Sequence, residues 1–131
     1  MSAGTRARLS PGEQLRGEGR PLSVMGSGMG QPSFTLYATE LFSQFGVERI
    51  IRVGTAGGIS PKVKIGDVIV ATGAHTDSSM NQLRIPGVNF SAVADFHLAQ
   101  AAYKASLTGQ ESLDGEVHLG TVFSRDHFYL T

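Results

Sequence analysis

Arg49-Ile50-Ile51-Arg52-Val53-Gly54-Thr55-Ala56-Gly57-Gly58 is an apolar run that ends in a glycine-rich turn, and it is the stretch that most strongly indicates the fold and function of this chain. Its β-branched residues predict a strand buried on both faces, with the stem of Arg52 in the interior and its guanidinium near the strand's end. Burying an unpaired guanidinium costs on the order of several kcal/mol, so a negative partner is expected there. The turn holds no acid, its glycines allow backbone N–H groups to approach a ligand, and Thr55 adds a hydroxyl. The stretch therefore predicts a phosphate or sulfate cradle. The alternative is that Arg52 pairs with a distant acid, Asp67 or Asp95, and that the glycines only form a turn.

The composition is that of a single domain able to bury a modest core. The 131 residues include 11 basic and 11 acidic side chains, so charge gives no reason to expect nucleic acid or an anionic membrane as partner. Cysteine is absent, which excludes disulfides and thiolate metal sites. No apolar run approaches the roughly 20 residues of a spanning helix. We expect a cytoplasmic protein without membrane partners.

The first half of the chain predicts a parallel βαβ unit. Residues 1–20 carry four arginines and few apolar side chains, which predicts a flexible leader. Residues 21–25 are a strand candidate that runs into the glycine turn 26–30. Apolar residues at helical spacing then predict a helix over 34–45, followed by the strand 49–53. Both glycine turns would lie at the carboxyl edge of the sheet, where ligands bind in such folds.

The second half continues the same pattern. The run 68–74 reads as a buried strand, and the polar stretch 75–89 as a long loop that serves function or subunit contact. Residues 92–107 predict a helix with Asp95 in its first turn, and 116–123 predict a last strand. The fold class expected is α/β, with a mixed and mostly parallel sheet flanked by helices.

Several motifs in order resemble the bacterial hexameric purine nucleoside phosphorylases. They are Ser23-Val24-Met25-Gly26-Ser27-Gly28-Met29-Gly30-Gln31-Pro32-Ser33, Arg49 to Gly57, Ala74-His75-Thr76-Asp77-Ser78, Ala94-Asp95-Phe96, and Ser124 to Tyr129. The resemblance implies that residues 21–131 are the central portion of a nucleoside phosphorylase-like domain, truncated relative to the family. Uridine phosphorylases and nucleosidases share that fold, and the Thr76-Asp77-Ser78 loop favours the purine enzymes.

The resemblance implies phosphorolysis, in which a purine nucleoside and phosphate give free base and ribose 1-phosphate. Phosphate would be held by Arg52, Val53, Gly54 and Thr55, the last standing where the family usually has serine. The nucleoside would contact Met29, Ala56, Gly57, Phe128 and Tyr129. An arginine fork with backbone donors suits a phosphate dianion, so no metal or organic cofactor is expected beside inorganic phosphate.

Each of these roles has an alternative in ordinary packing. A methionine at position 29 is more often core filler than a ribose contact. The alternative for Phe128 and Tyr129 is that they only cover the end of the sheet. The four histidines lack metal-ligand spacing, and each is expected to lie at the surface or on a local partner; they are His75, His97, His118 and His127.

Two acidic residues invite a catalytic role that their surroundings do not favour. Asp126 adjoins Arg125, and a loop ion pair between the two is the expectation. Asp77 and Arg84 lie in the long loop, where ordering of the loop or a subunit contact is expected rather than chemistry.

The family pattern also extends beyond this sequence on both sides. Upstream it has a glycine-arginine loop that residues 1–19 do not match, and a further arginine from a neighbouring subunit. Downstream it has a glutamate for the ribose hydroxyls and an aspartate that protonates the leaving base, both past Thr131. Without that general acid, turnover is expected to fall about a hundredfold or more. A catalytically silent module that binds phosphate and nucleoside, or that serves in assembly, is the alternative function. Uncovered apolar edges predict a homo-oligomer or a complementary chain.

Overall fold

The computed structural model describes residues 15–17, 20–83, 85–109 and 115–129. The chain forms two compact units, residues 1–52 and 53–131, and each is described by itself. The leader expected at 1–20 lies largely outside the described residues, although β1 (Leu15–Gly17) falls within it. Among the described residues, neither helix combines the length and the apolar character needed to cross a membrane.

The first unit holds a small hairpin and one helix, and it corrects the βαβ prediction. Strand β1 pairs antiparallel with β2 (Arg20–Leu22), so the strand expected at 21–25 is short and belongs to a hairpin. Residues 49–53 form no strand, and Val53 is 89% exposed. The expected parallel pair is therefore absent from the described part of the chain. Strand propensity is realised only where a neighbouring strand accepts the backbone hydrogen bonds, and 49–53 has no such neighbour.

The helix of this unit confirms its prediction and begins earlier than expected. Helix α1 (Gly30–Gln44) follows a turn in which Gly28 adopts φ +71°, a conformation that favours glycine. A Cβ at Gly28 would lie 2.7 Å from Cβ of Ser33, so the turn has no room for a side chain. Gly46, with φ +64°, follows the last turn and adopts a conformation that suits the end of a helix. Half-buried side chains mark the inner face of the helix: Phe34, Tyr37, Ala38 and Leu41.

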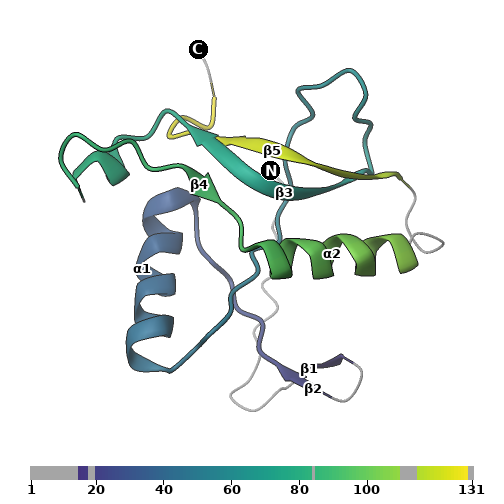
Figure 1. The fold of residues 1–131 in the computed structure, drawn as a ribbon, viewed down its shortest axis with the longest axis horizontal. Coiled ribbons are helices and arrows are strands. Elements are labelled where there is room, and N and C mark those ends of the chain that lie inside the picture. Colours follow the sequence, from purple (N-terminus) through teal and green to yellow (C-terminus); the bar gives the residue numbers. More distant parts are fainter. Residues whose placement is uncertain (1–14, 18–19, 84, 110–114, 130–131) are drawn as a thin grey trace. The chain divides into compact units, whose positions relative to one another are not determined.

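The second unit is built on a three-stranded sheet. Strand β3 (Val68–Thr76) lies in the centre, between β4 (Ala92–Val93), which pairs antiparallel, and β5 (Val117–Ser124), which pairs parallel. Figure 1 shows β3 and β5 side by side along most of their length. The strands expected at 68–74 and 116–123 are confirmed, and the sheet is mixed as predicted. It contains one parallel and one antiparallel pair, so a mostly parallel sheet is not seen among the described strands.

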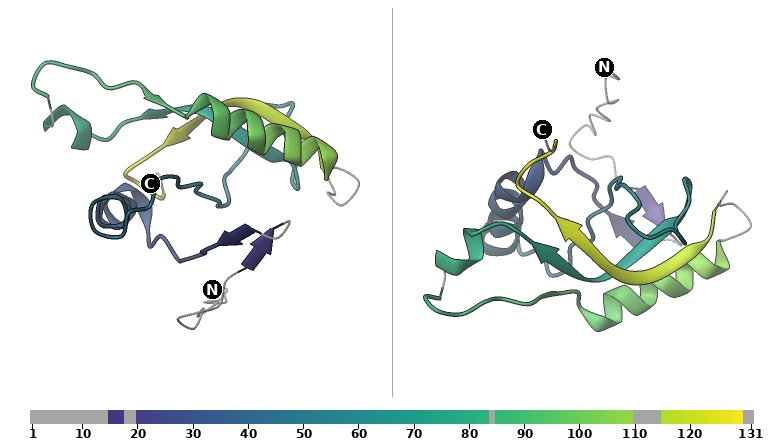
Figure 2. Two further views of the ribbon diagram at one scale, coloured as in Figure 1. Left: turned by 60° about the horizontal axis from the view of Figure 1, so that its bottom comes forward. Right: turned by 90° about the horizontal axis from the view of Figure 1, so that it is seen from above.

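Helix α2 (Phe96–Thr108) packs against β3 and β5, and Figure 2 shows it running along both strands. It begins four residues later than the predicted helix because Ala92–Val93 pair with β3 instead. Asp95 is its N-cap, whose carboxylate accepts a hydrogen bond from the Leu98 backbone N–H at 2.9 Å. Val70 on β3 is the buried apolar residue of the described chain, and several side chains of α2 are half-buried: Leu98, Ala99, Ala102, Tyr103 and Ser106.

The amino ends of β3 and β5 are joined through Asp67, whose side chain is only 3% exposed. Its carboxylate accepts hydrogen bonds from the backbone N–H of Lys64 at 2.8 Å and of Glu116 at 2.9 Å. The ring of His118 donates its Nε2–H to the same carboxylate at 2.8 Å. Led by the Lys64 and Glu116 backbone donors, with His118 third, these bonds lower the pKa of Asp67 from 3.8 to about 2. Gly115 completes the junction, since a Cβ there would lie 2.6 Å from the backbone of Gly66.

Candidate functional site

The predicted phosphate cradle is an irregular, exposed segment. Arg52 and residues 53–57 lie outside every helix and strand, and all of them are exposed. The expectation that the Arg52 stem is buried inside a strand is therefore wrong. In the part of the chain that the structure describes, neither Arg52 nor residues 53–57 take part in a hydrogen bond or ion pair. The guanidinium, the backbone N–H groups and the Thr55 hydroxyl are thus available as donors to an anion.

Asp67 and Asp95, the alternative partners for Arg52, are both engaged within the second unit. The Asp67 carboxylate is occupied by Lys64, Glu116 and His118. Asp95 caps α2. These contacts use the carboxylates of both acids, and the anion interpretation of Arg52 stays a prediction.

The nucleoside residues fall in both compact units. The boundary lies between Arg52 and Val53, so Met29 and Arg52 belong to the first unit and the remaining predicted site residues to the second. Met29 precedes α1 with extended backbone (φ −108°, ψ 121°), and it is 82% exposed. Exposure of that size argues against core filler as its role. Ala56 and Gly57 lie in the exposed segment after Arg52.

Phe128 and Tyr129 form an exposed aromatic pair just after β5. Their ring centroids are 5.0 Å apart, with an interplanar angle of 70°, which is an edge-to-face contact. They are 84% and 79% exposed, too open to serve as a cap over the sheet. Both lie beyond the carboxyl end of β5, the edge at which ligands bind in α/β sheets.

In the turn after β5, the carboxylate that accepts hydrogen bonds is that of Asp77, not that of Asp126. The Nε–H of Arg125 donates to Oδ2 of Asp77 at 3.1 Å, and the backbone N–H of Asp126 donates to Oδ1 at 3.0 Å. The expected ion pair between Arg125 and Asp126 is therefore wrong. The Asp126 backbone donor, ahead of the Arg125 contacts, lowers the pKa of Asp77. Arg84 lies outside the described residues.

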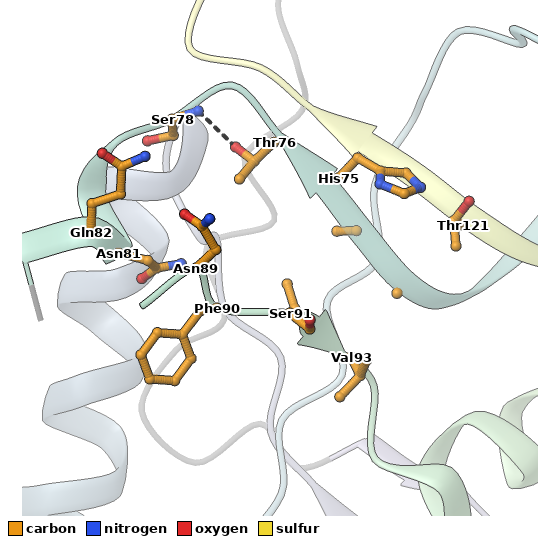
Figure 3. A pocket seen from close by; sticks show the side chains of 13 residues that line it. His75, Thr76, Ser78, Asn81, Gln82, Asn89, Phe90, Ser91, Val93 and Thr121 are labelled. Carbon is orange, nitrogen blue, oxygen red and sulfur yellow. Dashed lines mark hydrogen bonds between the residues drawn. The ribbon is translucent and has the colours of Figure 1, made fainter. Parts of the chain in front are cut away.

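The structure also contains a hollow that sequence reasoning did not identify. It has a volume of about 430 Å³ and lies against the carboxyl half of β3, the 3₁₀ helix η1 (Met80–Leu83) and the segment 89–93. Figure 3 shows the amides of Asn81, Gln82 and Asn89 beside Ser78 on one side, with His75 and Thr121 on the other. The polar composition of 75–89 was the available signal. No residue predicted for phosphate or nucleoside lines the hollow, and its described lining holds no arginine or lysine to pair with a phosphate dianion.

The described residues include no group of three or more His, Cys, Asp or Glu side chains placed to hold a metal ion. His118, with its ring on Asp67, is an example of a histidine with a local partner.

Comparison with known proteins gives a consistent result. The model of the phosphorylase superfamily matches residues 8–131. The DeoD-type purine nucleoside phosphorylase of Myxococcus xanthus is 52% identical over 111 residues, which cover 85% of this chain and 45% of that protein. The DeoD-type enzyme of Shewanella loihica is 49% identical over 112 residues, covering 86% of this chain and 46% of the relative. That of Colwellia psychrerythraea is 44% identical over 112 residues, with the same coverage. The chain thus spans about half the length of the curated relatives it matches.

Proposed function

The chain belongs to the phosphorylase superfamily, and from this premise we propose that it acts in the phosphorolysis of purine nucleosides. The reaction is a pentosyl transfer: a purine ribonucleoside or deoxyribonucleoside and inorganic phosphate give free base and the sugar 1-phosphate. The observation that carries the proposal is the identity of 52% to a DeoD-type purine nucleoside phosphorylase over 85% of this chain. The role would be in purine salvage, and we place it in the cytoplasm.

Phosphate binding is assigned to Arg52, Val53, Gly54 and Thr55. The guanidinium offers a planar fork of donors, and the turn adds backbone N–H groups and a hydroxyl. None of these groups is engaged elsewhere among the described residues, which supports the assignment. A phosphate held there would attack C1′ of the sugar while the bond from C1′ to the base breaks and the base keeps the electron pair. Its negative charge would also stabilise the oxocarbenium-like sugar of the transition state.

Nucleoside binding is assigned to residues in both units. Ala56 and Gly57 have small or no side chains and leave space for the base, and Met29 would pack against the ribose. Phe128 and Tyr129 would lie beside the purine ring, a flat apolar surface that aromatic side chains contact well. Their exposure beyond the carboxyl end of β5 is consistent with such a role.

A second candidate is a module that binds phosphate and nucleoside without turning them over. This alternative follows from coverage, since the chain matches 45% of the Myxococcus relative. Catalytic residues in the other part of that protein would have no counterpart among the matched residues. Uridine phosphorolysis and nucleoside hydrolysis are further options within the superfamily. Competition by uridine or methylthioadenosine would separate them.

Release of hypoxanthine from inosine tests the proposal. We expect release that requires phosphate and yields ribose 1-phosphate, measured by chromatography of the products with and without phosphate. Release at equal rates without phosphate would contradict phosphorolysis and indicate hydrolysis. No release, with phosphate and inosine each raising the Tm, would favour the silent module.

We further propose that the protein assembles as a homo-oligomer. Large apolar side chains outside the proposed binding site are exposed on both units, among them Phe45, Ile59 and Ile65. Exposed apolar surface on this scale is typical of interfaces. Light scattering coupled to size-exclusion chromatography is expected to give a mass of at least two chains, and a monomer at high concentration would contradict the proposal.

A further inference from the structure

We propose that Asp77 is a positioning residue for the purine: its carboxylate holds the turn after β5 and thereby sets where Phe128 and Tyr129 present their rings. The inference rests on the proposed function, in which these two rings contact the base. It assigns a role to a residue of the long loop that carries no part of the chemistry itself.

The register of the two parallel strands brings Asp77 to this turn. Thr76 of β3 pairs with Ser124 of β5, and this is the last pair of the ladder. Asp77 and Arg125 directly follow these two strands, so they leave the sheet side by side. Their proximity is a consequence of the strand register, since the two residues are 48 positions apart in the sequence.

The Asp77 carboxylate then engages two consecutive residues with its two oxygens. Oδ2 accepts from the Nε–H of Arg125 at 3.1 Å, and Oδ1 accepts from the backbone N–H of Asp126 at 3.0 Å. The guanidinium carbon of Arg125 also lies 5.4 Å from the centroid of the Phe123 ring. One contact to a side chain and one to the next backbone N–H fix the direction in which the chain leaves β5.

Asp77 is itself held in place by its neighbours. The backbone N–H of Ser78 donates to Oγ1 of Thr76 at 3.0 Å, the bond drawn in Figure 3. Because Asp77 lies between these two residues in the sequence, the bond closes a local turn around it. Ser78 is buried, and its hydroxyl accepts from the backbone N–H of Met80 at 3.4 Å. The backbone around Asp77 is therefore held by local hydrogen bonds after β3, while its carboxylate accepts hydrogen bonds from residues after β5.

The aromatic pair depends on this backbone because little else restrains it. Within the described residues, Phe128 and Tyr129 make an edge-to-face contact with each other and no hydrogen bond. Both rings are exposed, so packing does not set their orientation. The nearest restraint on the described backbone is the Asp77 contact to Asp126, two residues before Phe128. Loss of that contact should therefore disorder the base-binding rings while leaving the phosphate segment unchanged.

Three variants of the full chain test the proposal: Asp77→Ala, Asp77→Asn and the control Asp126→Asn. The control removes one carboxylate from the same turn but keeps the backbone N–H on which Asp77 acts. We measure the affinity for hypoxanthine by calorimetry, the Tm shift produced by inorganic phosphate, and hydrogen exchange of residues 125–129. For Asp77→Ala we expect hypoxanthine affinity about tenfold weaker, faster exchange at 125–129 and an unchanged phosphate shift. Asp77→Asn keeps an acceptor for Asp126 and should lose less. Asp126→Asn should match the wild type.

Unchanged hypoxanthine affinity or unchanged exchange in Asp77→Ala would overturn the proposal. Equal losses of hypoxanthine affinity and of the phosphate shift would also overturn it, because Asp77 would then be a general structural residue. If the wild type binds no hypoxanthine, the nucleoside part of the proposed function is wrong. In that case the exchange of residues 125–129 still decides whether Asp77 holds the segment.

Discussion

Hypoxanthine release from inosine by the Arg52→Ala variant is expected to fall about a hundredfold or more, because the phosphate loses its guanidinium partner in the transition state. Removal of one well-placed donor to a developing or fully charged oxygen typically costs a factor of this size. Should the wild type bind without turnover, the same loss is expected in phosphate affinity. It is then read from the phosphate concentration needed to raise the Tm.

Arg49→Ala is the matched control for this variant. Arg49 lies three residues upstream in the same irregular segment, is also exposed, and has no role in the proposed site. Its replacement removes the same charge, so any general electrostatic attraction for phosphate falls equally in both variants. Equal effects of the two substitutions would contradict a specific role for Arg52. Arg52→Lys should recover only part of the loss, since lysine keeps the charge without the planar fork.

The Asp67→Asn variant is expected to lower the Tm by roughly 10 °C at neutral pH, because the junction of β3 and β5 loses a charged acceptor that serves three donors. Asparagine has the same shape, but one of its two polar ends is an N–H donor. That end would face either the Glu116 N–H or the pair of donors from Lys64 and His118. The side chain is nearly inaccessible to water, which makes a mismatched donor costly.

The same variant should change how stability depends on pH. The folded-state pKa of Asp67 is about 2, compared with 3.8 for an unperturbed carboxyl. Between these values the unfolded chain binds a proton at Asp67 and the folded chain does not, so acid favours unfolding. The stability supplied by Asp67 is therefore present above pH 4 and is lost as the pH falls toward 2. In Asp67→Asn this part of the pH dependence should be absent.

Circular dichroism of thermal unfolding, followed from about pH 5 to about pH 2, measures both effects. Asp126→Asn serves as control, since its carboxylate accepts no hydrogen bond among the described residues and its loss should leave the Tm nearly unchanged. A pH profile of Asp67→Asn parallel to that of the wild type would show that the Asp67 contacts do not persist in solution.

The strands β3 and β5 and the helix α1 could be predicted from the sequence because their signals are local. The apolar run of β3, the β-branched and aromatic residues of β5 and the helical spacing along α1 each lie within a single element. Asp95 was expected in the first turn of the second helix, whereas the structure shows it as the N-cap of α2. The motif order supported the superfamily assignment, which the match over residues 8–131 confirms.

The failed predictions share one physical cause. Residues 49–53 have the composition of a buried strand, but a strand also needs a neighbour to accept its hydrogen bonds, and composition does not supply one. The start of α2 was placed too early for a related reason: Ala92 and Val93 are taken up by pairing with β3. In both cases a strand distant in the sequence decided the local structure: residues 49–53 lack a partner among the described strands, whereas Ala92 and Val93 have one in β3.

The sequence by itself determined where helices and strands can form, which residues supply donors for an anion, and the superfamily to which the chain belongs. Only the tertiary structure decided the pairing of Asp67 with His118 and of Asp77 with Arg125. Sequence adjacency favoured Asp126 as the partner of Arg125, whereas the parallel register of β3 and β5 sets Asp77 beside it. Propensity and capping act over a few residues, while these side-chain contacts join positions 51 and 48 residues apart. Such pairs exist only once the strands have aligned, so no local pattern could reveal them.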